Sequence, residues 1–569
     1  MGGSRKVAGR SGRNRSTILA AIAIVLLVGG TVLAMQVRDE DVEPDEGGDS
    51  PSTELAATDR RFDVNDPIER ACALPPELLR RIWRGHDPAH SEDVTIVPLA
   101  PNYSGSFGVT SHSGPWDYLQ TVPLVFYGPD HIKPLGRLDS EADITDVYAT
   151  VGELTGAPLE PRAGTARNKI LTNDASPPKV VVTVMWDGVG RNVLERWPDA
   201  WPNLARLERE GASFVKGTVG SSPSITPATH STIGTGAFPR SHGVTAIEFR
   251  ADDGTVATSF AGRDPKDLDL STFGDQIDQH FDNRSMVGLL GWRAWHLGMM
   301  GHGTQYPGGD DDQLGMIGLD DQITGNPDFY STPEYLAGFP GLQKRFDELD
   351  LSDGEADGEW MGHVIAEMHD NPAWINYQTD VLLAMLENEG YGADDVPDFF
   401  FTNFKMTDIV GHQYTMDSDE MSGVLKAQDA ALRRLVDYLD DEVGDYVLVL
   451  SADHGHTPSP ERTGAWPILQ GRLSDDVDSH FEVTGESLIK QTTAVGPFLN
   501  SGAMEAAGVT AADIAEFLNG YTIRDNWGPE DLPEDYEGRG EENVLAAALA
   551  SEQLDEIMEC AFDGVPPGG

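Results

Sequence analysis

The chain has 569 residues, 39% of them hydrophobic, so it is long enough to bury a substantial core. Its 94 acidic and 40 basic residues give a formal net charge of −54 at pH 7. Because so acidic a surface repels phosphate backbones, the composition excludes nucleic acid as a partner held by charge.

The amino-terminal end has the charge pattern of a membrane anchor. Residues 1–16 are basic, residues 17–35 carry no charge, and residues 36–65 form an acidic linker. A helix over 17–35 roughly spans a bilayer core, and the basic flank predicts that the amino terminus stays inside. We therefore expect a single-pass cell-membrane protein whose catalytic domain, residues 66–569, is extracytoplasmic. A cleavable signal peptide is the alternative, and the length of the apolar run favours the anchor.

Only two cysteines are present, Cys72 and Cys560, near the two ends of the exported region. Outside the cell they are expected to form a disulfide. The alternative is two buried thiols that never meet.

The stretch from residue 92 to 165 carries His112 in a loop before an apolar, strand-like run at 122–127. A helix is expected to follow over 144–155, ended by Gly156. On this pattern alone, His112 is an ordinary loop histidine.

A continuous apolar run at 180–186 predicts a central parallel strand that ends at Asp187. Further on, Thr226 precedes Pro227, a pair that predicts a helix start with Thr226 as its N-cap. A helix N-terminus concentrates unpaired N–H groups on an anion, and a hydroxyl there is well placed to attack phosphorus. An ordinary helix cap is the simpler interpretation of this pair.

Two more predicted strands end near carboxylates. Asp408 and His412 follow the apolar run at 399–401, and Asp453 and His454 follow the strand at 446–450. Three strand-end groups of carboxylate and imidazole ligands, together with a helix-capping hydroxyl, indicate a site for two metal ions.

The motifs WDGVG, TPATH, DIVGH and SADHG occur in this order, and with them the chain resembles the alkaline phosphatase superfamily, closest to its type I phosphodiesterase/nucleotide pyrophosphatase branch. The resemblance implies an α/β fold with a mostly parallel sheet sandwiched by helices in three layers. It also implies an enzyme that hydrolyses small phosphorylated substrates with Thr226 as the nucleophile.

The resemblance divides the ligands between two divalent metal ions. The first ion takes Asp187, Thr226, Asp453 and His454, and the second takes Asp408, His412 and His112. Mixed nitrogen and oxygen ligands favour zinc, with manganese as the alternative. In the family, the segment that resembles residues 92–165 follows the Asp-His-Gly motif, so its position before Asp187 predicts a circular permutation. If His112 is only a loop histidine, His456 or His480 would be the last ligand instead.

Three further residues are candidates for supporting roles. Lys405 is a candidate for binding a phosphoryl oxygen, although lysines near strand ends are usually solvated. His230 is expected to pack behind the nucleophile, and His456 either orients a ligand or lies in an exposed loop. Residues 292–396 resemble an insertion and are a candidate cap over the site, or else a surface excursion.

The sequence leaves the ester class open. Relatives of the pyrophosphatase type carry an asparagine about twenty residues after the nucleophile, and the matching segment HGVTAIEFR has none. We expect a phosphodiesterase, with a phosphomonoesterase on the same scaffold as the alternative. A surface binding protein on a catalytically dead fold is disfavoured, because every ligand position is filled. No protein partner can be inferred.

Overall fold

The computed structural model describes residues 62–173, 176–318, 320 and 322–562, which belong to one compact unit. The expected basic tail, the membrane helix at 17–35 and most of the acidic linker lie outside the described residues. Within the described ranges, no helix is long and apolar enough to cross a bilayer.

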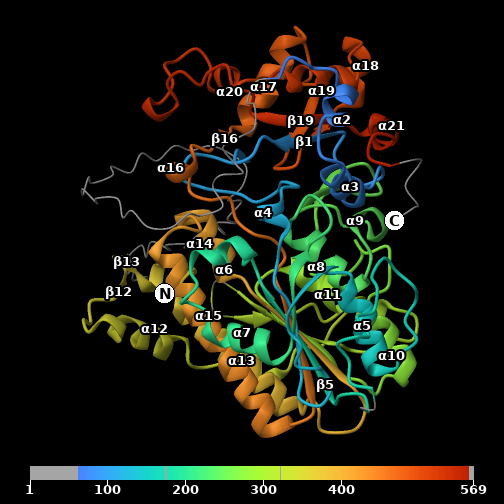
Figure 1. Ribbon diagram of the computed structural model, residues 1–569, viewed down its shortest axis with the longest axis vertical. Coiled ribbons are helices and arrows are strands. Elements are labelled where there is room, and N and C mark those ends of the chain that lie inside the picture. The colour runs from blue at the N-terminus through green and yellow to red at the C-terminus, as the bar shows by residue number, and fades with distance from the viewer. Residues whose placement is uncertain (1–61, 174–175, 319, 321, 563–569) are drawn as a thin grey trace, which may run out of the picture. The chain divides into compact units, whose positions relative to one another are not determined.

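A nine-stranded sheet organises this unit (Figure 1), in the order β11-β10-β9-β14-β5-β15-β3-β6-β4. Its strands are β3 (Leu124–Tyr127), β4 (Gly136–Asp143), β5 (Val180–Trp186), β6 (Ala212–Thr218), β9 (Val287–Gly291), β10 (Gln313–Ile317), β11 (Ile323–Thr324), β14 (Asp398–Phe404) and β15 (Tyr446–Ser451). The five adjacent strands β10, β9, β14, β5 and β15 are parallel to one another. The strands that flank them, β11 and β3, are antiparallel to β10 and β15. The sheet is therefore mixed but mostly parallel, as predicted.

Helices cover both faces of the sheet, which gives the predicted three layers. Figure 1 shows α7 (Pro202–Glu210), α13 (Pro372–Glu389) and α15 (Asp419–Tyr438) on one side. On the other side it shows α5 (Asp146–Thr155), α8 (Thr226–Thr235), α10 (Phe273–Phe281) and α11 (Leu297–Met300). Every residue of β5, β14 and β15 is buried, because helices exclude water from both faces.

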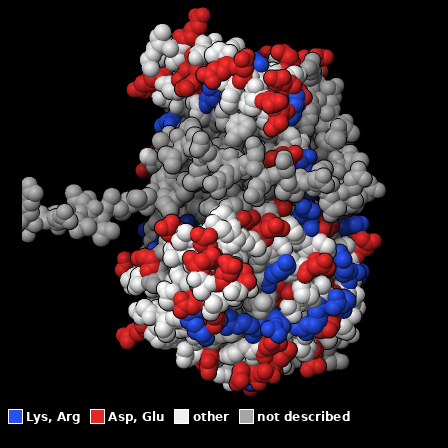
Figure 2. Space-filling model, turned by 90° about the vertical axis from the view of Figure 1, so that its left-hand side faces the viewer, with Lys and Arg blue, Asp and Glu red and all other residues white. Residues whose placement is uncertain are grey.

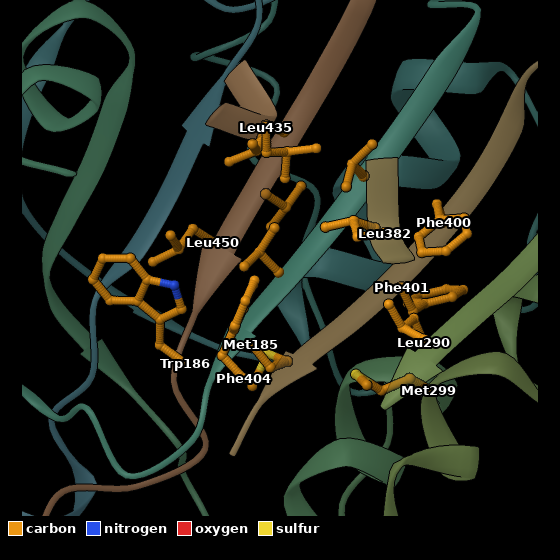
Figure 3. Packing of buried hydrophobic residues seen from close by; sticks show 14 of the residues in the cluster. Met185, Trp186, Leu290, Met299, Leu382, Phe400, Phe401, Phe404, Leu435 and Leu450 are labelled. Carbon is orange, nitrogen blue, oxygen red and sulfur yellow. The ribbon is translucent and has the colours of Figure 1, made fainter. Parts of the chain in front are cut away.

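The core lies between these layers. Figure 3 shows Met185 and Trp186 of β5 beside Phe404 of β14 and Leu450 of β15. Leu382 of α13, Leu435 of α15 and Met299 of α11 complete it from the helices. Continuous apolar strands therefore predict the centre of the sheet well, since both of their faces are buried.

Residues 292–396, the candidate cap, contribute to the core of the fold. They supply β10, which pairs in parallel with β9, and α13, which packs against α15. Whether the rest of this region covers the site stays a prediction.

A smaller two-stranded sheet pairs β1 (Val94–Pro98) with β19 (Leu545–Ala550) in antiparallel register. Next to it, the predicted disulfide joins Cys72, the last residue of α2 (Pro67–Cys72), to Cys560, with Cα atoms 5.5 Å apart. The bridge links two segments that lie 488 residues apart in the chain.

Acidic side chains are spread over the molecular surface. Figure 2 shows Asp and Glu scattered over one face, interrupted in its lower part by a band of Lys and Arg.

Candidate active site

The three predicted strand-end carboxylates converge because their strands are neighbours. β5 lies between β14 and β15, and all three run in the same direction. Asp187 directly follows β5, Asp453 follows β15, and Asp408 lies on α14 (Met406–Tyr414) just after β14. The Gly188 amide donates a 2.9 Å hydrogen bond to Asp453 Oδ1, which ties two of these ends together.

The first ligand group consists of Asp187, Asp453 and His454, all completely buried. His454 Nε2 lies 3.3 Å from Asp453 Oδ2 and 3.6 Å from Asp187 Oδ1. Two atoms bound to one tetrahedral zinc ion at about 2.0–2.2 Å lie about 3.3–3.6 Å apart. The spacing of these side chains therefore fits one ion.

The second group consists of Asp408, His412 and His112. Asp408 and His412 lie one turn apart on α14, with His412 Nε2 3.3 Å from Asp408 Oδ1. His112 comes from a loop almost three hundred residues earlier, and its Nε2 lies 3.4 Å from the same oxygen. Its Nδ1 hydrogen-bonds to the Ser224 carbonyl at 2.9 Å, which aims Nε2 at Asp408. The structure thus brings all three residues together.

His456 is completely buried and does not lie in an exposed loop. Its Nε2 lies 3.6 Å from Asp408 Oδ1, in a group with His454. A Cβ atom added at Gly411 or Gly188 would come within 2.3 or 2.5 Å of this nitrogen. The glycines of DIVGH and WDGVG therefore make room for the imidazole. His480, by contrast, is exposed at the end of α17 (Gln470–His480).

The predicted cap position of Thr226 is wrong by one residue. Ile225 occupies the N-cap of α8 and Thr226 is the first helical residue, and no side chain caps the helix. The Thr226 hydroxyl instead accepts a 3.1 Å hydrogen bond from Lys405 Nζ. It is therefore held by the neighbouring strand end and not by its own helix.

Lys405 is buried, so the solvated alternative for this residue is wrong. Its ammonium lies 3.0 Å from Asp187 Oδ1 and 2.7 Å from Asp408 Oδ2, between the two ligand groups. Burial alone would lower the pKa of Lys405, but these carboxylates outweigh it and raise the pKa above its usual value. Lys405 therefore stays charged at neutral pH.

His230 is a buried residue of α8, one turn after Thr226. Its Nδ1 hydrogen-bonds to the Thr226 carbonyl at 2.7 Å, and its Nε2 receives a 3.1 Å hydrogen bond from Asn403. The same Asn403 amide donates to Asp187 Oδ2 at 3.0 Å. Asn403 thus holds a ligand carboxylate in place, a role that its place inside an apolar strand gave no reason to expect.

His296 was also missed by the sequence analysis. It is completely buried, forms a candidate metal-binding group with Asp187 and His230, and stacks edge-on against His230 at 4.8 Å between ring centroids. It lies within the candidate cap region, five residues after the end of β9, and this strand end beside β14 is the signal that could have found it.

Several ligand atoms have no hydrogen-bond partner within the described part of the chain. They are Asp408 Oδ1, Asp453 Oδ2, His454 Nε2 and both ring nitrogens of His456. Buried polar atoms are rarely left unpaired, because each costs desolvation free energy. An orphaned set of carboxylate and imidazole atoms fits divalent metal ions.

Three residues of the site have pKa shifts that favour metal binding, whereas burial and Asp453 raise the pKa of Asp187, and Asp408 outweighs burial and raises the pKa of His412. Burial, reinforced by His454, lowers the pKa of His112 to about 4. Burial also holds the pKa of His456 well below its usual value. Burial alone would raise the pKa of Asp408, but Lys405 and His412 outweigh it and hold that pKa well below normal. Neutral imidazoles and an ionised carboxylate are the forms that bind metals.

Comparisons with known proteins show which proteins this chain is similar to. The chain is 24% identical over 450 residues to a protein of Myroides odoratus named calcium-transporting ATPase, covering 68% of this chain and 77% of that one. It is 24% identical over 340 residues to alkaline phosphatase PhoV of Synechococcus elongatus, covering 50% of this chain and 60% of that one. The crystal structure of wild-type alkaline phosphatase PafA matches 66% of this chain and 85% of its own, at 15% identity and a TM-score of 0.46.

Three parallel strands that end in buried carboxylates, with imidazoles and a helix-borne hydroxyl beside them, define a hydrolase of phosphoric esters in the alkaline phosphatase superfamily. The family model for type I phosphodiesterase/nucleotide pyrophosphatase matches residues 181–469, just over half of the chain. The chain belongs to this family.

Proposed function

We propose that the enzyme hydrolyses phosphodiesters of small molecules through a covalent intermediate on Thr226. The observation that carries this proposal is the hydrogen bond between Lys405 and the Thr226 hydroxyl. It places a hydroxyl at the start of a helix, in contact with a cation that also contacts Asp187 and Asp408.

Two divalent ions, zinc or else manganese, are proposed as cofactors. Asp187, Asp453, His454 and the Thr226 oxygen would hold one ion, and Asp408, His412 and His112 the other. Bound there, such ions supply positive charge that lowers the pKa of a coordinated hydroxyl and offsets the charge on phosphoryl oxygens.

The residues of the chain position the reaction. Lys405 and the start of α8 fix the Thr226 Oγ atom, which forms a bond to phosphorus while the ester oxygen leaves and takes up a proton. The intermediate on Thr226 keeps the second ester group of the substrate, and water then attacks its phosphorus, releases the phosphomonoester and restores the hydroxyl. His230 and Asn403 hold α8 and the Asp187 carboxylate in fixed positions during both steps.

The covalent step can be tested by acid-quenching the enzyme within one turnover of bis-(p-nitrophenyl) phosphate. Peptide mass spectrometry should find a p-nitrophenyl phosphoryl group on Thr226 and on no other residue. A chelator should abolish the signal, and added zinc should restore it. Turnover by Thr226→Ala at the wild-type rate, with no phosphopeptide in either protein, would overturn the mechanism.

A phosphomonoesterase is the second candidate, favoured by the similarity to the alkaline phosphatase PhoV. The ratio of kcat/KM for bis-(p-nitrophenyl) phosphate to that for p-nitrophenyl phosphate separates the two. A ratio well above one supports the diesterase, and a ratio well below one replaces it with the monoesterase.

We also propose that the enzyme is anchored in the cell membrane with its catalytic domain outside. The proposal rests on the basic, uncharged and acidic segments at the amino-terminal end of the sequence. Alkaline carbonate extraction tests it. Full-length enzyme should stay in the membrane fraction, and a variant that lacks residues 1–38 should not.

The circular permutation remains our proposal as well. It is supported by β3, which pairs with β15 in the sheet, and by His112, which reaches Asp408 from the loop before β3. A family member with the ordinary segment order tests it, because its last ligand histidine should superpose on His112.

A further inference from the structure

A second group of buried carboxylates lies away from the strand ends. Asp275 and Asp278 are on α10, and Asp310 and Asp312 are in the segment that leads into β10. Asp278 is 1% exposed and Asp312 is 3% exposed, while Asp310 is half-buried. These aspartates come from the GGDDDQ stretch and from a helix thirty residues before it.

The Asp275 carboxylate already accepts hydrogen bonds from neighbouring residues. Its carboxylate accepts hydrogen bonds from the Thr272 amide at 2.7 Å and from the amide and Nδ1 of His302 at 2.7 and 2.8 Å. It therefore forms a fixed wall of the group and is not a free ligand.

Asp312 is different, because neither of its carboxylate oxygens has a hydrogen-bond partner among the described residues. Asp278 Oδ1 has none either. The two carboxyl groups lie against each other, and burial, with each as a neighbour of the other, raises the pKa of Asp312. No lysine, arginine or histidine in the described ranges forms an ion pair with Asp278, Asp310 or Asp312.

The backbone around these carboxylates is fixed. Gln279 and Asn283 each donate a 2.9 Å hydrogen bond to the segment before Asp310, at the carbonyls of Pro307 and Gly308. The Ser331 amide donates to the Asp312 carbonyl at 2.9 Å. These hydrogen bonds hold the segment that carries Asp310 and Asp312 against the end of α10, the helix that carries Asp278.

Such an arrangement needs positive charge. Two unpaired carboxylates in a water-poor interior cost several kcal/mol unless a proton or a cation neutralises them. Every free ligand atom in this group is an oxygen, and oxygen-only sites select hard cations such as Ca²⁺ over zinc. The half-buried Asp310 leaves one side open for water ligands.

We propose that Asp278, Asp310 and Asp312 bind one hard divalent cation of the Ca²⁺ class. This site is separate from the strand-end centre in place and in ligand chemistry. Since α10 packs against α8, the cation would brace the helix that carries Thr226 and would take no part in the reaction.

Calcium binding by the zinc-loaded enzyme tests the proposal by equilibrium dialysis with ⁴⁵Ca²⁺. Wild type should bind one Ca²⁺ per chain at this site, and saturating Ca²⁺ should raise its Tm by about 3–5 °C. Asp312→Asn and Asp278→Asn should each lose both effects and keep wild-type kcat. Asp311→Asn, in the same segment but exposed, is the matched control and should behave as wild type.

Two results would overturn the proposal. One is that wild type binds no Ca²⁺ and its Tm does not respond, so that the two carboxyls share a proton. The other is that Asp312→Asn and Asp278→Asn both bind Ca²⁺ as tightly as wild type. Using two variants keeps the test decisive if one of them fails to fold.

Discussion

The strand-end site and the second carboxylate group, formed by Asp278, Asp310 and Asp312, both bury carboxylates. The side chains that surround these carboxylates differ between the two places. Around Asp187 and Asp408 the chain supplies imidazoles and the ammonium of Lys405, whereas Asp278 and Asp312 have only oxygens beside them. The kind of donor, and not the amount of negative charge, decides which ion each can bind.

The two regions also use a threonine at a helix start differently. On α10 the Thr272 side chain caps its helix and donates to the Met300 carbonyl at 2.9 Å. On α8 the Thr226 side chain makes no capping bond and contacts Lys405. The Thr226 hydroxyl is thus left free of capping, which is what the proposed nucleophile requires.

The largest expected effect comes from removing that hydroxyl. Thr226→Ala should lower kcat by about 10⁴-fold or more, because no other side chain can form the covalent bond. Metal content should fall little, since the carboxylates and imidazoles remain. Thr229→Ala, one turn along the same helix, is the control. Steady-state kinetics on both variants checks this, and equal losses would point to a folding effect.

The next largest effect concerns the ligand most distant in sequence. His112→Ala should reduce zinc content from two ions per chain towards one and lower kcat on the order of 1000-fold. Elemental analysis of dialysed protein measures the zinc content, and steady-state kinetics measures kcat. His480→Ala should change neither, since His480 is exposed. Full zinc content in His112→Ala would remove His112 from the ligand set and weaken the proposed permutation.

Lys405→Met tests what the buried ammonium contributes to the strand-end site. The Thr226 hydroxyl would lose its charged donor, so kcat should fall about 100-fold while the fold is retained. Lys216→Met, on strand β6 and largely exposed, should have no effect. A wild-type kcat in Lys405→Met would show that the metals alone position the hydroxyl.

The last prediction measures what burial of the Glu92 carboxyl costs. Burial raises the pKa of Glu92 to about 7, although the Thr95 hydroxyl donates to it at 2.6 Å. Because the folded state keeps the proton, stability is full below about pH 4.5 and falls by about 3 kcal/mol as the pH rises to about 7. Glu92→Gln should therefore be more stable than wild type at pH 8 and similar to it at pH 4.

Thermal unfolding of both proteins at the two pH values measures this difference. Glu77→Gln serves as the control, because Glu77 is exposed. A Glu92→Gln advantage that is the same at both pH values would contradict the titration.

Much of the fold followed from local patterns. The runs at 180–186, 399–401 and 446–450 predicted central strands because both of their faces had to be apolar, and the structure places them side by side. Motif spacing also predicted that Asp187, Asp408 and Asp453 would meet, since neighbouring parallel strands end at one edge of a sheet.

Other features had no local signal. Lys405 looked like a solvated lysine until the fold placed two carboxylates around it. Asn403 sits among apolar residues, where a polar side chain reveals its role only through partners distant in sequence. The cap position of Thr226 was wrong because tertiary hydrogen bonding outweighed the local preference of threonine.

The sequence by itself determined the mostly parallel α/β core, the ligand types and the family, because periodicity and motif spacing are written along the chain. Tertiary structure alone decided which cation Thr226 touches and which aspartates are left without partners. Those outcomes depend on packing between segments such as α10 and the GGDDDQ stretch. No local sequence pattern shows that these two segments lie side by side in the fold.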